Sequence, residues 1–178
     1  MSGAHEDFER LVSAYERRIY NVALKLSSNA EDAADLTQET FLRAFRGWGN
    51  FRKESQAYTW LYRIVVNLNK DRIARESRRR EKETSLFVGE TGEQTMELPD
   101  GEPSPGQVAE NREVRGVLLR AIEGLQPGYR ECVVLRDMEG LSYEEIASVM
   151  DITVEAVRSR LARARQQLRQ TLTPYLKI

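Results

Sequence analysis

The 178-residue chain is poor in the side chains that build covalent or metal-dependent sites, with one cysteine and one histidine. Since Cys132 has no second cysteine to pair with, no disulfide can form within the chain, which suits a reducing compartment. Cys132 lies in an apolar run, so we expect a small buried core residue rather than a redox sensor. His5 lies far from Cys132 in the sequence. The chain therefore lacks both the group of ligands that a metal site needs and the neighbouring residues that a Cys/His nucleophile needs. We therefore expect no metal, no cofactor and no catalytic residues.

Long apolar runs are also missing. No stretch of about eighteen apolar residues occurs, and the polar, acidic N-terminus lacks the apolar core of a signal peptide. We therefore expect a cytoplasmic protein with no permanent membrane association.

Net charge is nearly absent, at −1, but it is unevenly distributed. Residues 1–83 hold 16 Lys and Arg against 13 acids, and residues 114–178 hold 10 against 8. Residues 84–113 between them hold one Arg and seven acids. Two mildly basic blocks thus flank an acidic connector, and the charge of each block says more about partners than the total does.

Residues 1–83 are expected to form one bundle of helices. Apolar side chains recur at helical spacing over residues 8–26, about 30–45 and about 56–80. Residues 28–29 separate the first two helices and can cap the second, and residues 47–50 (GWGN) end it. No alternating run of β-branched residues marks a strand, so the fold class is all-α.

Residues 84–108 have the composition of a flexible linker. Residues 84–106 hold four Gly, three Pro and five acids, with few large apolar side chains. Helical spacing returns over about 108–125, is interrupted by Pro127 and Gly128, and continues over about 129–138. Residues 109–178 therefore form a second helical domain.

A helix-turn-helix pattern ends this second domain. Ser142 and Glu145 have the spacing of a capping box, Asp151 to Thr153 form the turn, and Thr153 is the expected N-cap of the next helix. That helix has an apolar stripe of Val154, Val157, Leu161, Ala164 and Leu168. Its other side carries Glu155, Ser159, Ala162, Arg163 and Gln166, with Arg158, Arg165 and Arg169 along one edge. Such a helix can enter a major groove, although a solvated amphipathic helix is the alternative.

Two segments carry a family pattern. The first reads DLTQETFLRAF over residues 35–45, with FR at 51–52 and YTWLYRIVVN at 58–67. The second reads GLSYEEIA over residues 140–147, with VRSRLARAR at 157–165. In this order, across an acidic linker, they resemble the extracytoplasmic-function (ECF) sigma factors of bacterial RNA polymerase.

The resemblance implies that the DLxQE segment docks on the clamp helices of the largest polymerase subunit. The core polymerase-binding residues would then be Asp35, Leu36, Gln38 and Glu39. Leu42 adds an apolar contact to the same broad helix face. A simpler alternative is that acidic residues near the start of this helix interact favourably with its dipole. This explains Glu31 and Asp32 but not Gln38 and Glu39, which lie two turns further along.

The resemblance also implies a reader of the promoter −10 element between Trp48 and Asn67. Melting needs aromatic faces, cations and hydrogen-bonding groups that hold an unstacked base. The residues that offer them are Phe51, Arg52, Ser55, Tyr58, Thr59, Trp60, Arg63 and Asn67. For Trp60, a place in the core is an equally weighted alternative. The basic run from Arg72 to Arg80 could follow upstream phosphates or simply end a solvated helix.

For the −35 element the implied residues are Arg158, Ser159, Ala162, Arg163 and Arg165. Arg158, Ser159 and Arg163 match family positions that face bases. Arg165, like Arg160, suits phosphates or packing of its stem. Ala162 is smaller than the residue often found there, which limits it to weak contacts such as a thymine methyl.

The sequence thus predicts two small helical domains joined by an acidic flexible linker, with a helix-turn-helix in the second. The function implied is that of an alternative sigma factor that binds core RNA polymerase and promoter DNA, and the resemblance adds an anti-sigma factor as a partner. A polymerase-independent helix-turn-helix regulator is the alternative. An enzyme acting on nucleic acid is disfavoured because no suitable carboxylate or His/Cys cluster is present.

Overall fold

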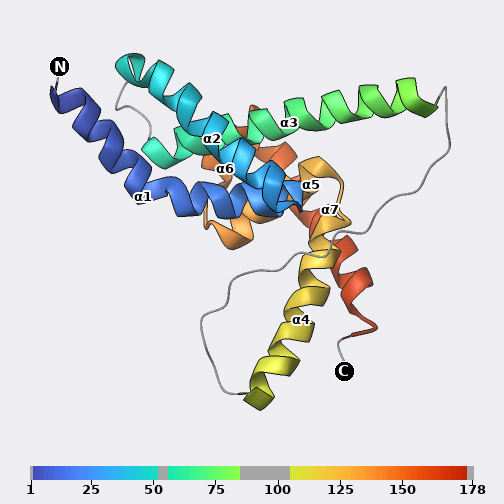
Figure 1. Cartoon of the computed structure of the whole chain (residues 1–178). Coiled ribbons are helices and arrows are strands. Elements are labelled where there is room, and N and C mark those ends of the chain that lie inside the picture. The colour runs from blue at the N-terminus through green and yellow to red at the C-terminus, as the bar shows by residue number, and fades with distance from the viewer. Residues whose placement is uncertain (1, 52–55, 85–104, 176–178) are drawn as a thin grey trace. The chain divides into compact units, whose positions relative to one another are not determined.

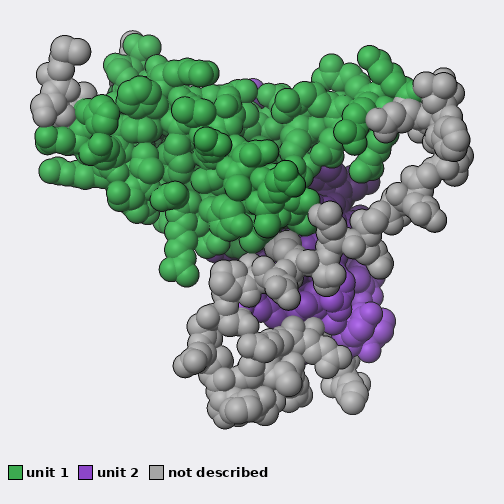
Figure 2. Space-filling model, viewed as in Figure 1, with its two compact units in different colours: residues 1–96, 148–150 green, residues 97–147, 151–178 purple. Residues whose placement is uncertain are grey.

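The structure is a computed structural model that describes residues 2–51, 56–84 and 105–175. These residues form helices and turns, so the all-α prediction is confirmed for this part of the chain (Figure 1). The chain divides into two compact units, residues 1–96 with 148–150 and residues 97–147 with 151–178 (Figure 2). Most of the predicted linker, residues 84–108, lies outside the described residues.

The first unit is a bundle of three long helices. These are α1 (Ser2–Ser27), α2 (Ala30–Gly47) and α3 (Ala57–Thr84), with a short 3₁₀ turn, η1 (Trp48–Asn50), after α2. The three helices contact one another pairwise. Their buried side chains include Ile19, Val22, Leu26, Ala33, Ala44, Leu61, Tyr62, Val65 and Val66. α1 begins earlier and α3 ends later than the sequence pattern predicted.

Asn29 sets the corner between α1 and α2, as predicted. Its side-chain oxygen accepts hydrogen bonds from the amides of Glu31 at 2.8 Å and Asp32 at 3.1 Å. These bonds satisfy donors that the first turn of a helix otherwise leaves without partners. Ser28, just before, has a left-handed backbone with φ 58°.

The second unit contains α4 (Pro105–Glu123), α5 (Pro127–Val133), most of α6 (Tyr143–Met150) and α7 (Val154–Leu172). Pro127 begins α5, because the first helical position is where its missing N–H costs nothing. The core of this unit includes Leu125, Cys132, Val133, Leu135, Leu141, Ile146, Val157, Leu161 and Ala164. The prediction that Cys132 is a buried core residue is confirmed.

A π-helical turn, η2 (Val134–Met138), follows α5 where the sequence predicted ordinary helix. The amide of Glu139 donates to the carbonyl of Val134 at 3.0 Å. Gly140, with φ 76°, then turns the chain toward α6. The wider turn changes the direction in which Arg136 and Asp137 leave the backbone, which local spacing alone does not reveal.

The helix-turn-helix caps agree with the predictions. The Ser142 hydroxyl accepts from the amide of Glu145 at 3.1 Å, and the Glu145 carboxylate accepts from the amide of Ser142 at 2.7 Å. Asp151 has the left-handed conformation, with φ 56° and ψ 52°. Thr153 accepts from the amide of Ala156 at 3.1 Å and so begins α7.

Candidate functional site

The predicted polymerase-binding residues occupy different depths on α2. Asp35 and Gln38 are exposed and Glu39 is half-buried, whereas Leu36 is only 6% exposed. Glu39 pairs with Arg43 one turn on, at 2.9 Å. Leu36 therefore belongs to the packed side of the helix, and the surface of the motif consists of its three polar residues.

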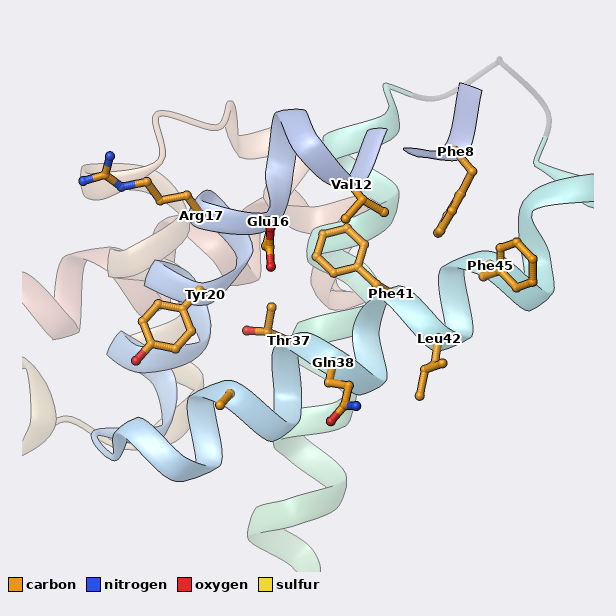
Figure 3. A pocket seen from close by; sticks show the side chains of 11 residues that line it. Phe8, Val12, Glu16, Arg17, Tyr20, Thr37, Gln38, Phe41, Leu42 and Phe45 are labelled. Carbon is orange, nitrogen blue, oxygen red and sulfur yellow. The ribbon is translucent and has the colours of Figure 1, made fainter. Parts of the chain in front are cut away.

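An apolar groove runs between α1 and α2 beside Gln38. In Figure 3, Phe8 and Val12 project from α1, and Phe41, Leu42 and Phe45 project from α2. The groove has a volume of about 650 Å³. Leu42 and Phe45 are 45% and 51% exposed, an unusual state for large apolar side chains at neighbouring positions. We name this feature the α1/α2 groove; of its residues, sequence reasoning had singled out Gln38 and Leu42.

Asp35 and Glu39 face the other side of α2, toward α3. Together with Arg72, Arg75 and Glu76 they line a polar hollow. The motif is thus divided, because Gln38 borders the apolar groove and the two carboxylates border the polar hollow.

Arg72 is held by side chains from both helices. Its Nη1 lies 3.1 Å from Asp32 Oδ2 and 2.7 Å from Glu76 Oε1. Its Nη2 donates at 3.2 Å to Asn69, which is 1% exposed. With an 18% exposed side chain, Arg72 fastens α2 to α3 and is a poor candidate for contacting phosphates.

The start of the predicted −10 surface is a cluster of stacked aromatic rings. The Phe51 ring is stacked against Trp48 at 5.5 Å and against Trp60 at 4.7 Å, and the two indoles are themselves 6.3 Å apart, measured between ring centroids. Phe8 of α1 meets the Trp48 ring at 5.5 Å with the edge-on geometry that aromatic pairs favour. Trp60 is half-buried, so part of its surface remains accessible. Trp48 is absent from the predicted set, although the aromatic density over residues 48–60 points to it.

The remaining predicted −10 residues are distributed along α3. Thr59, Arg63 and Asn67 recur at intervals of four, which places them along one side of the helix. Arg63 and Asn67 are exposed, whereas Thr59 is buried and Tyr58 is half-buried against Tyr62. Arg52 and Ser55 lie outside the described residues.

The predicted −35 residues all lie on exposed positions of α7. Arg158, Ser159, Ala162, Arg163 and Arg165 are exposed, while Val157, Leu161 and Ala164 are buried. The predicted separation of the helix into two faces is therefore present. Ser159 and Arg163 also line a hollow with Tyr129 of α5.

Arg165 differs from the other arginines of this face because it has an internal partner. Its Nη2 lies 2.7 Å from Asp137 Oδ1 in η2. This hydrogen bond raises the pKa of Arg165, although partial burial opposes the shift. Arg160, in contrast, lies with its guanidinium close to Gly128 at the start of α5.

No described group of three or more His, Cys, Asp or Glu side chains is arranged to hold a metal ion. Among the helices of the described ranges, none has both the length and the apolar character required to cross a membrane.

The sequence matches two family models in the predicted order. Sigma-70 region 2 matches residues 11–79, which include the α2 motif and most of α3, and Sigma-70 region 4 matches residues 115–168, which include the helix-turn-helix.

Known proteins match over nearly the whole chain. The RNA polymerase sigma-H factor of Pseudomonas aeruginosa is 37% identical over 176 residues, covering 98% of this chain and 91% of that protein. The ECF RNA polymerase sigma-E factor of Escherichia coli is 34% identical, with the same coverage of 98% and 91%. The ECF RNA polymerase sigma factor SigE of Mycolicibacterium smegmatis is 38% identical over 172 residues, covering 97% of this chain and 64% of that protein. The chain therefore belongs to the ECF sigma factors, which are alternative RNA polymerase sigma factors.

Two solved structures share the fold. The sigma factor RpoE in complex with the anti-sigma factor NepR from Bartonella quintana has a TM-score of 0.77 at 24% identity, covering 94% of this chain and 98% of that one. CnrH in complex with the cytosolic domain of CnrY has a TM-score of 0.67 at 24% identity, covering 97% and 92%.

Proposed function

We propose that the two helical units divide the work of promoter recognition. Residues 1–83 bind core RNA polymerase and open the −10 element, and residues 109–178 bind the −35 element. Residues 84–108 form the linker that connects these two domains. The observation that carries this proposal is that one chain presents both an exposed polar motif beside an apolar groove on α2 and an exposed arginine-bearing face on α7.

On α2, we assign direct polymerase contacts to Asp35, Gln38 and Glu39. The α1/α2 groove supplies apolar contact, because Leu42 and Phe45 leave large side-chain surfaces in water that a partner helix would cover. Leu36 supports this surface from within the helix packing. The partner is the clamp-helix pair of the largest polymerase subunit.

An anti-sigma factor is the second partner that we assign to this face. RpoE and CnrH, which share the fold, were solved bound to NepR and to CnrY. A protein that covers Gln38, Leu42 and Phe45 would exclude the polymerase without changing the fold of the sigma factor. We place the chain in the cytoplasm, where the polymerase lies.

On α3 and η1, we assign −10 recognition to the aromatic cluster and to the exposed side chains that follow it. The accessible parts of the Phe51 and Trp60 ring faces can stack on an unpaired base. Arg63 offers charge and Asn67 offers hydrogen bonds. Thr59, which is buried, acts through packing.

On α7, we assign base contacts to Arg158, Ser159 and Arg163, with Ala162 limited to van der Waals contact. The protein performs no chemistry of its own in this scheme; it positions the polymerase on DNA and stabilises the melted strand.

Reconstituted transcription tests the proposal. The chain, mixed with core polymerase, should co-migrate with it and direct initiation from a −35/−10 promoter that core polymerase alone ignores. A polymerase-independent regulator would instead bind promoter DNA with high affinity and fail to associate with core polymerase.

A further inference from the structure

Asp137 and Arg165 form an ion pair that joins two elements of the DNA-binding unit. Arg165 Nη2 and Asp137 Oδ1 are 2.7 Å apart, and the two side chains are 47% and 40% exposed. Asp137 belongs to the π-helical turn η2, and Arg165 lies on α7 along the same edge as Arg158. The pair therefore stands at the border of the proposed DNA face.

Side chains from η2 and α6 lie close to this pair. Tyr143 at the start of α6 acts with Asp137 to raise the pKa of Arg165. The Tyr143 ring is itself held by Arg136, whose guanidinium carbon lies 5.1 Å from the ring centroid. Arg136 also donates to the carbonyl of Leu141 at 2.7 Å. Three elements, η2, α6 and α7, thus converge on the Arg165 guanidinium.

A paired arginine contributes differently to DNA binding from a solvated one. Sequence-independent affinity comes from Lys and Arg side chains that neutralise phosphates and release counterions. A phosphate would have to share the Arg165 guanidinium with a close carboxylate, and that carboxylate would itself repel the DNA. Residues 114–178 hold only 10 basic residues, so Arg165 is one of few cations there that could neutralise a phosphate.

We propose that Asp137 is a specificity-determining residue, because it holds Arg165 in an internal ion pair and so withholds this cation from phosphates of any sequence. Discrimination is then left to Arg158, Ser159 and Arg163, which face the bases. This inference rests on the proposed placement of the DNA face on α7. Of the two roles that the sequence left open for Arg165, phosphate contact or packing of its stem, the phosphate contact then becomes available chiefly when the pair is broken.

The test is binding of the full-length protein to a fluorescently labelled duplex of mixed sequence, followed by anisotropy across a range of salt concentrations. Asp137→Asn should bind more tightly, and the plot of log affinity against log salt should steepen by about 0.9, the value for one added phosphate contact. Over a fourfold change in salt concentration, one such contact changes the ratio of the variant's affinity to the wild-type affinity by about threefold. Asp137→Glu, which keeps the carboxylate, should return the slope toward the wild-type value.

The Arg165→Ala background separates this effect from a general change of charge. In that background Asp137→Asn should not steepen the plot of log affinity against log salt, because the arginine that it would release is absent. Glu144→Gln on α6 is the matched control, since it removes one exposed negative charge and leaves the pair intact. Circular dichroism on each variant verifies that the helices remain folded.

Two results overturn the inference. Either Asp137→Asn leaves the slope unchanged or lowers it, or it raises the slope equally in both backgrounds. The proposed function is tested apart from this by the double variant Arg158→Ala, Arg163→Ala. If that variant keeps the wild-type base preference at the −35 element in reconstituted transcription, the DNA face itself is misplaced, whatever Asp137→Asn does.

Discussion

Arg158 and Arg163 differ from Arg165 in what their guanidinium groups can reach, although all three are exposed on α7. Arg165 has a carboxylate partner at 2.7 Å, whereas Arg158 and Arg163 lie on the face that the proposal turns toward bases. The sequence cannot distinguish these roles, because the helix carries five arginines and their roles depend on which side chains lie beside each guanidinium group in the fold.

Replacing Arg158 or Arg163 by Ala should cost about 1–3 kcal/mol each in −35 recognition, because a bidentate contact to a base is lost. The loss should relax preference at particular −35 positions. The measurement is transcription by reconstituted holoenzyme from promoters altered one −35 base at a time. Arg120→Ala, an exposed arginine on α4, is the control. A uniform decrease across all promoters would contradict base contact by these residues.

The polar part of the α2 motif should carry a measurable share of polymerase affinity. Gln38→Ala combined with Glu39→Lys should weaken binding to core polymerase by at least about tenfold, or about 1.4 kcal/mol. Glu39 also loses its surface pair with Arg43, but such a pair is worth only about 0.3–0.5 kcal/mol to folding. Helicity should therefore persist.

The measurement is a titration of labelled sigma factor with core polymerase. Glu81→Lys, an equal charge reversal near the end of α3, should bind as the wild type does. Equal affinities for the motif variant and this control would remove α2 from the polymerase interface.

The caps and turns of the helices follow closely from sequence, because they depend on neighbours a few residues away. Asn29, Ser142 and Thr153 each cap the helix that the sequence assigned to them. The turn η2 does not follow in this way, since its geometry brings Asp137 to Arg165, 28 residues along the chain. The depth of Leu36 was missed for the same reason, because its burial depends on how α2 packs against other helices.

The turn between α6 and α7 offers a test of backbone strain at Asp151. A left-handed conformation costs a side-chain-bearing residue about 1–2 kcal/mol, less for Asp, whereas glycine adopts it freely. Asp151→Gly should therefore stabilise the second unit by about 0.5 kcal/mol, after allowance for the greater freedom of glycine in the unfolded chain. Asp151→Ala should destabilise it. Thermal unfolding followed by circular dichroism gives both values, and a higher midpoint for the Ala variant than for the wild type would contradict the strain argument.

Each of the two units has a buried core of its own, so each is expected to fold when separated from the other. Fragments 1–83 and 109–178 should show helical spectra and cooperative melting, although chains of this length have only marginal stability. The fragment 1–83 should retain binding to core polymerase, because it contains α1, α2 and the groove between them.

The measurements are thermal melts of the two fragments beside the full chain and the same polymerase titration. Non-cooperative melting of both fragments would place the domain boundary elsewhere. Binding by fragment 109–178 alone would contradict the assignment of the main polymerase contact to the first unit.

The close approach of Trp60 to Gly47 has a consequence for how this sequence can evolve. A Cβ at position 47 would lie 3.2 Å from Trp60 Cζ2, closer than side-chain carbons usually approach. The neighbouring Phe51 ring limits how far the indole can retreat, since the two rings are stacked at 4.7 Å. Larger residues at position 47 should therefore be tolerated chiefly when the side chain at position 60 becomes smaller. The residues at these two positions should covary. A library randomised at both positions and selected for promoter-dependent growth would reveal this covariation, which a scan of single substitutions would miss.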